Sequence, residues 1–167
     1  MDGSLLAPAA EETETLHALE SDANPEHGLL KESVTEKETA RTAYEGKTVL
    51  LVDDDPRNVF SLTSLLNHHR MNVYSAENGR EALELLESGI PVDLVLMDIM
   101  MPEMDGYEAI ERIRGTTDWS SLPIIVLTAK AMKGERDKCL QAGASDYLAK
   151  PVSIDQLLSL LKVWLSR

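Results

Sequence analysis

The stretch VDLVLMDIMMPEMDG, residues 92–106, is an almost continuous apolar run that ends in an aspartate and a Met-Met-Pro turn. A second run of the same kind, PIIVLT, occupies residues 123–128. Apolar runs of this length without polar alternation are typical of strands that helices cover on both faces. The two runs therefore predict the centre of a parallel sheet.

Amphipathic segments alternate with β-type runs on both sides of this centre. The predicted strands are residues 48–53, 71–75, 92–97, 123–128 and 146–149. The predicted helices, with apolar residues three and four apart, are residues 57–70, 79–88, 107–114, 135–142 and 154–165. Five such units within about 120 residues predict a small doubly wound α/β fold.

The last predicted helix opens with Ser153 and Gln156 in the positions of a capping box. Its predicted core stripe consists of Ile154, Leu157, Leu158, Leu161 and Leu165. Leu160 and Trp164 fall on the shoulder of that stripe. They form either a contact surface for another molecule or a contact with a neighbouring element of the same fold.

Residues 1–45 differ from the rest of the chain, because they contain eleven acidic and three basic residues and show no sustained apolar period. Such a composition is typical of a solvated tail or linker. The sequence therefore predicts an acidic tail over residues 1–45 and one folded domain over residues 46–167. The chain stops where the last helix ends, so we expect either a stand-alone domain or a module excised from a longer protein.

The composition excludes several classes of protein. A net charge of −13 argues against binding to nucleic acids or to anionic membranes, which require a basic surface. No apolar run approaches the ~20 residues that span a bilayer, and the start of the chain lacks a signal peptide, so we expect a cytoplasmic protein. Cys139 is the single cysteine, which excludes an intramolecular disulfide, and we interpret it as a small buried thiol.

Polar residues gather where the predicted strands end. Asp53 and Asp54 follow the first strand, Asp98 the third, Thr128 ends the fourth, and Lys150 follows the fifth. In open parallel sheets these ends share one edge, where functional sites form. Taken singly, the aspartates are equally explained as helix-entry or turn-capping residues and Lys150 as a solvated lysine. Carboxylates crowded on one edge repel each other, however, and a hard divalent cation such as Mg²⁺ is the simplest compensation.

Four segments together resemble the signature of one family, the receiver domains of two-component response regulators. They are VLLVDDDP, LVLMDIMMPEMDGYE, IIVLTAKA and DYLAKPV, in that order. The set is most similar to receivers attached to hybrid histidine kinases. The resemblance implies a flavodoxin-like fold with five parallel strands in the order 2-1-3-4-5 and five helices.

The resemblance also implies roles for site residues. Asp98 is the expected phosphoacceptor, and Asp53 and Asp54 are the acidic pair that holds Mg²⁺ together with Asp98 and the backbone carbonyl of Met100. Lys150 is expected to offset charge on the phosphoryl oxygens.

Two further residues match the family's conformational switch. Thr128 corresponds to the hydroxyl that turns toward a new phosphoryl group, and Tyr147 to the aromatic residue that follows it inward. Without the resemblance, Tyr147 is equally well explained as an edge-strand aromatic residue that half covers the core.

The expected partner is a histidine kinase or a histidine phosphotransfer domain, which donates the phosphoryl group from a phosphohistidine. Candidate contacts on the first helix are Asn58, Ser61, Leu62 and Leu65, although both leucines also fit the core. A further expectation is self-association upon phosphorylation. The protein is then a signalling switch that assists its own modification and not an enzyme with an external substrate.

Two other functions remain open on the residues alone. One is a receiver-like interaction module that is never phosphorylated. The other is a magnesium-dependent phosphohydrolase with an aspartyl-phosphate intermediate, which would require an aspartate two residues after Asp98, where Met100 stands.

Overall fold

The computed structural model describes residues 43–129 and 132–166. The predicted tail lies outside these residues except for its last three positions. None of the helices in the described part of the chain is both long and apolar enough to cross a membrane.

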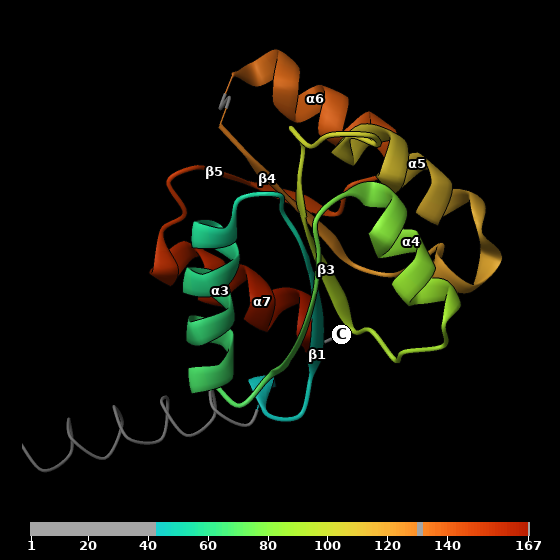
Figure 1. Ribbon diagram of the computed structural model, residues 1–167. Helices are drawn as coiled ribbons and strands as arrows, with labels where there is room; N and C mark the ends of the chain where they lie inside the picture. Colours follow the sequence, from blue (N-terminus) through green and yellow to red (C-terminus); the bar gives the residue numbers. More distant parts are fainter. Residues whose placement is uncertain (1–42, 130–131, 167) are drawn as a thin grey trace, which may run out of the picture. The chain divides into compact units, whose positions relative to one another are not determined.

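Five parallel strands form a single sheet in the order β2-β1-β3-β4-β5 (Figure 1). Their bounds are Thr48–Val52 for β1, Asn72–Ala76 for β2, Leu94–Asp98 for β3, Ile124–Thr128 for β4 and Asp146–Ala149 for β5. Each predicted strand lies within two residues of the observed one. The doubly wound fold and the 2-1-3-4-5 order are both confirmed.

Five α-helices connect and follow the strands in the described residues. Their bounds are Pro56–His68 for α3, Gly79–Glu87 for α4, Gly106–Gly115 for α5, Lys133–Ala142 for α6 and Ile154–Leu165 for α7, and a 3₁₀ turn, η2, spans Thr117–Trp119. Helix α7 has the predicted bounds, and the other four agree to within two residues.

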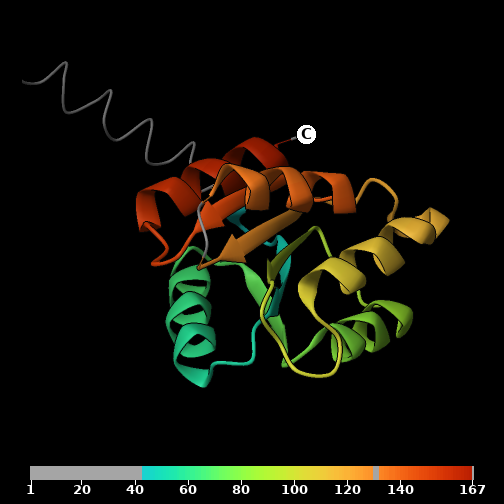
Figure 2. The same cartoon turned by 90° about the horizontal axis from the view of Figure 1, so that it is seen from above.

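The helices cover both faces of the sheet, α3 and α7 on one face and α4, α5 and α6 on the other (Figures 1 and 2). Strand β1 shows why two cores result. Leu50 and Val52 pack toward the α4–α5–α6 face, and Val49 and Leu51 pack toward the α3–α7 face. Because successive side chains of a strand point to opposite faces, a continuous apolar run supplies both cores.

Helix α7 differs from its predicted pattern at its start. Ser153 is the N-cap residue, as predicted, but its side chain makes no capping hydrogen bond, so the predicted capping box is not formed. Ile154 was expected in the core stripe and is instead 56% exposed. It lies in the first turn, where it lines a pocket with residues of α3 instead of packing under the sheet. Leu157, Leu161 and Leu165 are buried as predicted.

The shoulder residues of α7 contact their own fold. Leu160 and Trp164 are partly buried against the α3–α7 core. The indole N–H of Trp164 donates to Asp146 Oδ2 at 3.3 Å, which joins the end of α7 to the start of β5. Packing against a neighbouring element therefore explains both side chains.

The residues just before β1 also belong to the packed structure. Tyr44 is 3% exposed and joins the α3–α7 core. Its hydroxyl donates to the backbone carbonyl of Leu158 in α7 at 2.6 Å. The ordered unit thus includes Tyr44, two positions ahead of residue 46.

Candidate functional site

The strand register brings the predicted polar residues to one edge of the sheet. Val52 pairs with Met97, so Asp53, the next residue, lies beside Asp98 at the end of β3. On the other side of β3, Asp98 pairs with Leu127 of β4, which places Thr128 one position further along. Thr128 in turn pairs with Ala149, and Lys150 follows it. The carboxyl ends of four strands therefore meet at this site.

Asp53 is held in place by donors from the start of α3. Its side chain is fully buried, and its Oδ1 accepts a hydrogen bond from the backbone N–H of Asp55 at 2.9 Å. The Asn58 amide donates to its Oδ2 at 3.4 Å. Asp55 caps α3 by accepting from the Arg57 N–H, whereas Asp54 is exposed. The DDDP segment thus has one buried carboxylate, one exposed carboxylate and one that caps the helix.

Lys150 contacts both buried aspartates. Its Nζ lies 3.3 Å from Asp53 Oδ2 and 3.2 Å from Asp98 Oδ1. The Asp53 and Asp98 side chains are 0% and 8% exposed, and that of Lys150 is 22% exposed. One ammonium group therefore bridges two carboxylates that have little access to water.

Burial and neighbouring charges shift the pKa values of Asp98 and Lys150. Burial raises the pKa of Asp98, the Lys150 charge lowers it, and the neighbouring Asp53 charge raises it again, so that the net shift is upward. For Lys150, burial lowers the pKa, but the charges of Asp98 and Asp53 outweigh it and raise the pKa overall. The lysine is therefore charged at neutral pH, and Asp98 gains a proton more readily than an exposed aspartate does.

The three carboxylates fit a metal ion. Asp53, Asp54 and Asp98 each offer an oxygen, and these oxygens lie within 4.8 Å of one another. A hard divalent cation takes carboxylate oxygens from such a cluster. The structure thus brings together the three aspartates that the sequence placed in a metal site. Met100, the fourth predicted ligand through its carbonyl, lies in the loop after β3 and is 69% exposed.

Gly106 shapes the same loop and was missed as a site residue at the sequence level. A Cβ atom at Gly106 would lie 2.5 Å from the Asp98 carbonyl oxygen, closer than real Cβ atoms approach a backbone. Its N–H donates to the Ile99 carbonyl at 3.0 Å, which closes the loop onto the end of β3. The sequence signal that could have identified it is the glycine at the end of MDIMMPEMDG, because a position where the backbone approaches closely requires a residue without a Cβ atom.

The two predicted switch residues lie on neighbouring strands. Thr128 is 3% exposed, and its backbone carbonyl accepts from the Lys150 N–H at 2.7 Å. Tyr147 is partly buried on the edge strand β5, with the Arg136 guanidinium 5.5 Å from its ring centroid. The ring therefore lies beside α6, on the face of the sheet that α4, α5 and α6 cover.

The sequence of residues 49–162 matches the family model of the response regulator receiver domain. The chain belongs to the response regulator receiver family. Receiver domains are signalling switches of two-component systems, and the described residues carry the CheY-like fold of this family.

Three relatives illustrate the similarity of this receiver to known proteins. The signal transduction histidine-protein kinase BarA of Escherichia coli is 43% identical over 114 residues, which cover 68% of this chain and 12% of BarA. The receiver domain of sensor histidine kinase PA1611 from Pseudomonas aeruginosa PAO1, solved with a magnesium ion in its active site cleft, is 38% identical. Its TM-score is 0.68, and the match covers 73% of this chain and 99% of that one.

The third relative is a complex from Saccharomyces cerevisiae, in which the histidine phosphotransfer protein Ypd1 binds the receiver domain of Ssk1. It matches with 30% identity and a TM-score of 0.68, over 73% of this chain and 90% of that one. The receiver thus spans about an eighth of BarA and nearly the full length of the solved domains.

Proposed function

We propose that this receiver accepts a phosphoryl group on Asp98 from a phosphohistidine. The observation that carries the proposal is the Lys150 ammonium, which lies 3.2 Å from Asp98 and 3.3 Å from Asp53 at the rim of the sheet. A buried nucleophilic carboxylate beside a fixed cation and two further carboxylates has the groups that phosphoryl transfer requires.

The chemical step is a displacement at phosphorus. An oxygen of Asp98 attacks the phosphorus atom, the P–N bond to the histidine ring breaks, and the leaving ring nitrogen takes up a proton. Lys150 offsets the negative charge on the phosphoryl oxygens and keeps Asp98 close to them. Mg²⁺ held by Asp53, Asp54, Asp98 and the Met100 carbonyl would supply further positive charge at the same oxygens.

Thr128 and Tyr147 are the proposed switch. A phosphoryl group on Asp98 brings acceptor oxygens to the end of the neighbouring strand, where the Thr128 hydroxyl can donate a hydrogen bond to them. Tyr147 then packs toward the space that Thr128 leaves. Their placement on adjacent strands β4 and β5, with Val126 paired to Tyr147, supports this coupling.

A phosphodonor partner, a histidine kinase or a histidine phosphotransfer domain, is proposed to dock on α3 and the β5–α7 loop. A pocket of about 270 Å³ lies there next to Asp53 and Lys150. It is lined by the four predicted contact residues, Asn58, Ser61, Leu62 and Leu65, and by the exposed Ile154. Leu62 is 9% exposed and belongs to the core, so Ser61 and Ile154 offer more surface to a partner.

The relatives support a proposal for the wider setting of the domain. Receivers occur within kinases such as BarA, so we propose that residues 46–167 act either alone or as the receiver of a hybrid kinase, with residues 1–45 as tail or linker. A cytoplasmic location and phosphorylation-dependent self-association belong to the same proposal.

The interaction module without phosphorylation is disfavoured by the site itself, because the acceptor, the acidic pair and the lysine are all present and close together. The phosphohydrolase is disfavoured because Met100, two residues after Asp98, carries no acidic group.

The test is to incubate the protein with magnesium and acetyl phosphate and to measure its mass. One stable added phosphoryl group, absent in Asp98→Asn, is the expected result. Continuous release of phosphate without accumulation would favour the phosphohydrolase. No added mass in the presence of either acetyl phosphate or a phosphorylated histidine phosphotransfer domain would favour the interaction module.

A further inference from the structure

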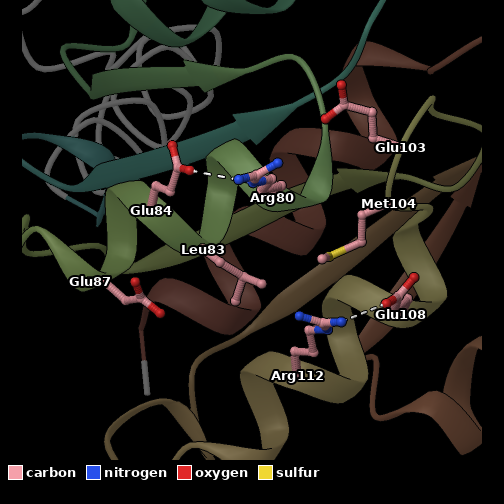
Figure 3. A pocket seen from close by; sticks show the side chains of 8 residues that line it. All are labelled: Arg80, Leu83, Glu84, Glu87, Glu103, Met104, Glu108 and Arg112. Carbon is pink, nitrogen blue, oxygen red and sulfur yellow. Dashed lines mark hydrogen bonds and ion pairs between the residues drawn. The ribbon is translucent and has the colours of Figure 1, made fainter.

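A second hollow lies away from the Asp98 site, between α4 and α5 (Figure 3). It has a volume of about 570 Å³, within the range of about 300–1,000 Å³ that ligand sites occupy. Side chains of α4, α5 and the loop that precedes α5 form its walls. We call it the α4–α5 groove.

The charges of the groove are not balanced. Arg80 pairs with Glu84 within α4 at 3.6 Å, and Arg112 pairs with Glu108 within α5 at 2.9 Å.

The two remaining acidic residues of the groove are Glu87 and Glu103. Neither of them has an ion pair with another residue of the described chain. In Figure 3, Glu87 and Glu103 lie at opposite ends of the groove, and Leu83 and Met104 lie between them. The groove therefore presents one uncompensated carboxylate at each end.

The floor of the groove is apolar and held in place. Leu83 is partly buried and Met104 is 8% exposed. The Met104 carbonyl accepts from the Gly79 N–H at 3.3 Å, which ties the loop to the start of α4. A Cβ atom at Gly79 would lie 2.7 Å from the Ala109 side chain, so α4 and α5 approach closely beneath the floor. Such a preformed surface loses little conformational entropy on binding.

We propose that the α4–α5 groove docks a short basic segment of a partner protein. Two lysine or arginine side chains of the segment would reach Glu87 and Glu103. Their aliphatic stems, together with apolar neighbours, would lie across Leu83 and Met104, because long basic side chains cover apolar surface while their charge stays in water.

Charge complementarity selects this occupant. At this groove, a second copy of this chain, with a net charge of −13, and an acidic segment would both be repelled by the two uncompensated carboxylates. The exposed Arg80–Glu84 and Arg112–Glu108 pairs are weak and can rearrange around a partner. Binding should therefore be modest in strength and should weaken with added salt.

The probe is the fluorescein-labelled synthetic peptide KLLRKLLK, and binding is followed by fluorescence anisotropy. Glu87→Gln with Glu103→Gln should weaken binding at least about fivefold. The matched control is Asp118→Asn with Asp137→Asn, which removes the same charge from exposed positions of η2 and α6 and should change binding less than about twofold. Peptide ELLEELLE should not bind.

A second control addresses the other acidic cluster. Asp54→Asn with Asp98→Asn should still bind the peptide, so a loss of binding in this variant would place the peptide at the Asp53–Asp54–Asp98 cluster and overturn the proposal. If the groove variant and the matched control lose the same peptide affinity, the peptide is attracted by the overall negative charge of the protein and not by the groove, which would overturn the proposal. Self-association of the wild type in sedimentation, abolished by the groove variant, would identify a second copy as the occupant and also overturn it.

Discussion

Opposite charges meet at similar distances in two regions of this receiver, yet the two regions differ in their access to water. Lys150 lies 3.2 and 3.3 Å from Asp98 and Asp53, whose side chains are 8% and 0% exposed. In the α4–α5 groove, Arg112 lies 2.9 Å from Glu108, with the two side chains 58% and 48% exposed. The shortest of these contacts is thus the most solvated.

The comparison shows that distance alone does not rank ion pairs. Water screens the groove pairs, so each contributes about 0.3–0.5 kcal/mol. At the strand ends, water cannot replace a lost partner, so removing one charge leaves others buried and unpaired. The stability of the buried cluster therefore depends on its cation, Lys150, whereas the groove does not depend on any single charge.

The largest effect should come from Lys150→Met, which keeps the apolar stem and removes the charge. Asp53 and Asp98 would remain buried without a cation, and we expect the free energy of unfolding at pH 7 to fall by about 2 kcal/mol. Urea titrations in EDTA measure this change. Magnesium should restore part of the loss, because it supplies positive charge to the same carboxylates. A variant as stable as the wild type would show that the Lys150 contacts do not stabilise the fold.

An intermediate effect should come from Tyr107→Phe. The Tyr107 hydroxyl donates to Glu135 across α5 and α6, and its pKa is raised by burial and by this hydrogen bond. We expect a loss of about 1 kcal/mol in the free energy of unfolding, because a partly buried charged acceptor loses its donor. Tyr74→Phe on the exposed edge strand is the matched control and should be neutral. Equal effects of the two changes would contradict the prediction.

Asp98→Asn should act in the opposite direction. Because the pKa of Asp98 is raised in the folded state, its contribution to stability is fully present below the ordinary aspartate pKa of about 3.9 and is lost as the pH rises through the folded value. The asparagine side chain of the variant stays uncharged at every pH, so the variant does not lose this stability as the pH rises. In EDTA at pH 7 the variant should be as stable as the wild type or up to about 1 kcal/mol more stable.

The pH series supplies the control for Asp98→Asn. The advantage of the variant should narrow as the pH falls toward about 4, where the wild-type carboxyl becomes protonated. A clear loss of stability at pH 7 would instead identify Asp98 as a structural cap.

The smallest effect should come from Arg112→Ala in the groove. The exposed pair with Glu108 should contribute no more than about 0.5 kcal/mol, and the difference from the wild type should disappear near about 1 M salt. Urea titrations at low and high salt measure it. A loss as large as that of Lys150→Met would remove the distinction between the two regions.

Local patterns in the sequence were sufficient to predict the strands and helices of this protein. Continuous apolar runs predicted the central strands β3 and β4, because strands covered on both faces need no polar alternation. Three- and four-residue spacing predicted the helices to within two residues. The positions of Asp53, Asp98, Thr128 and Lys150 at strand ends predicted their common edge, and the resemblance to receiver domains supplied the strand order and the roles.

The tertiary structure alone decided which of these groups touch and which side chains are covered. The register of β1 against β3 sets Asp53 beside Asp98, and only then does one lysine reach both carboxylates. Ile154 fits a core stripe by spacing but lies in the first turn of α7, where it is exposed. The α4–α5 groove joins residues of two helices and a loop. Periodicity reports the face on which a residue lies, whereas burial and pairing depend on neighbours far away in the sequence.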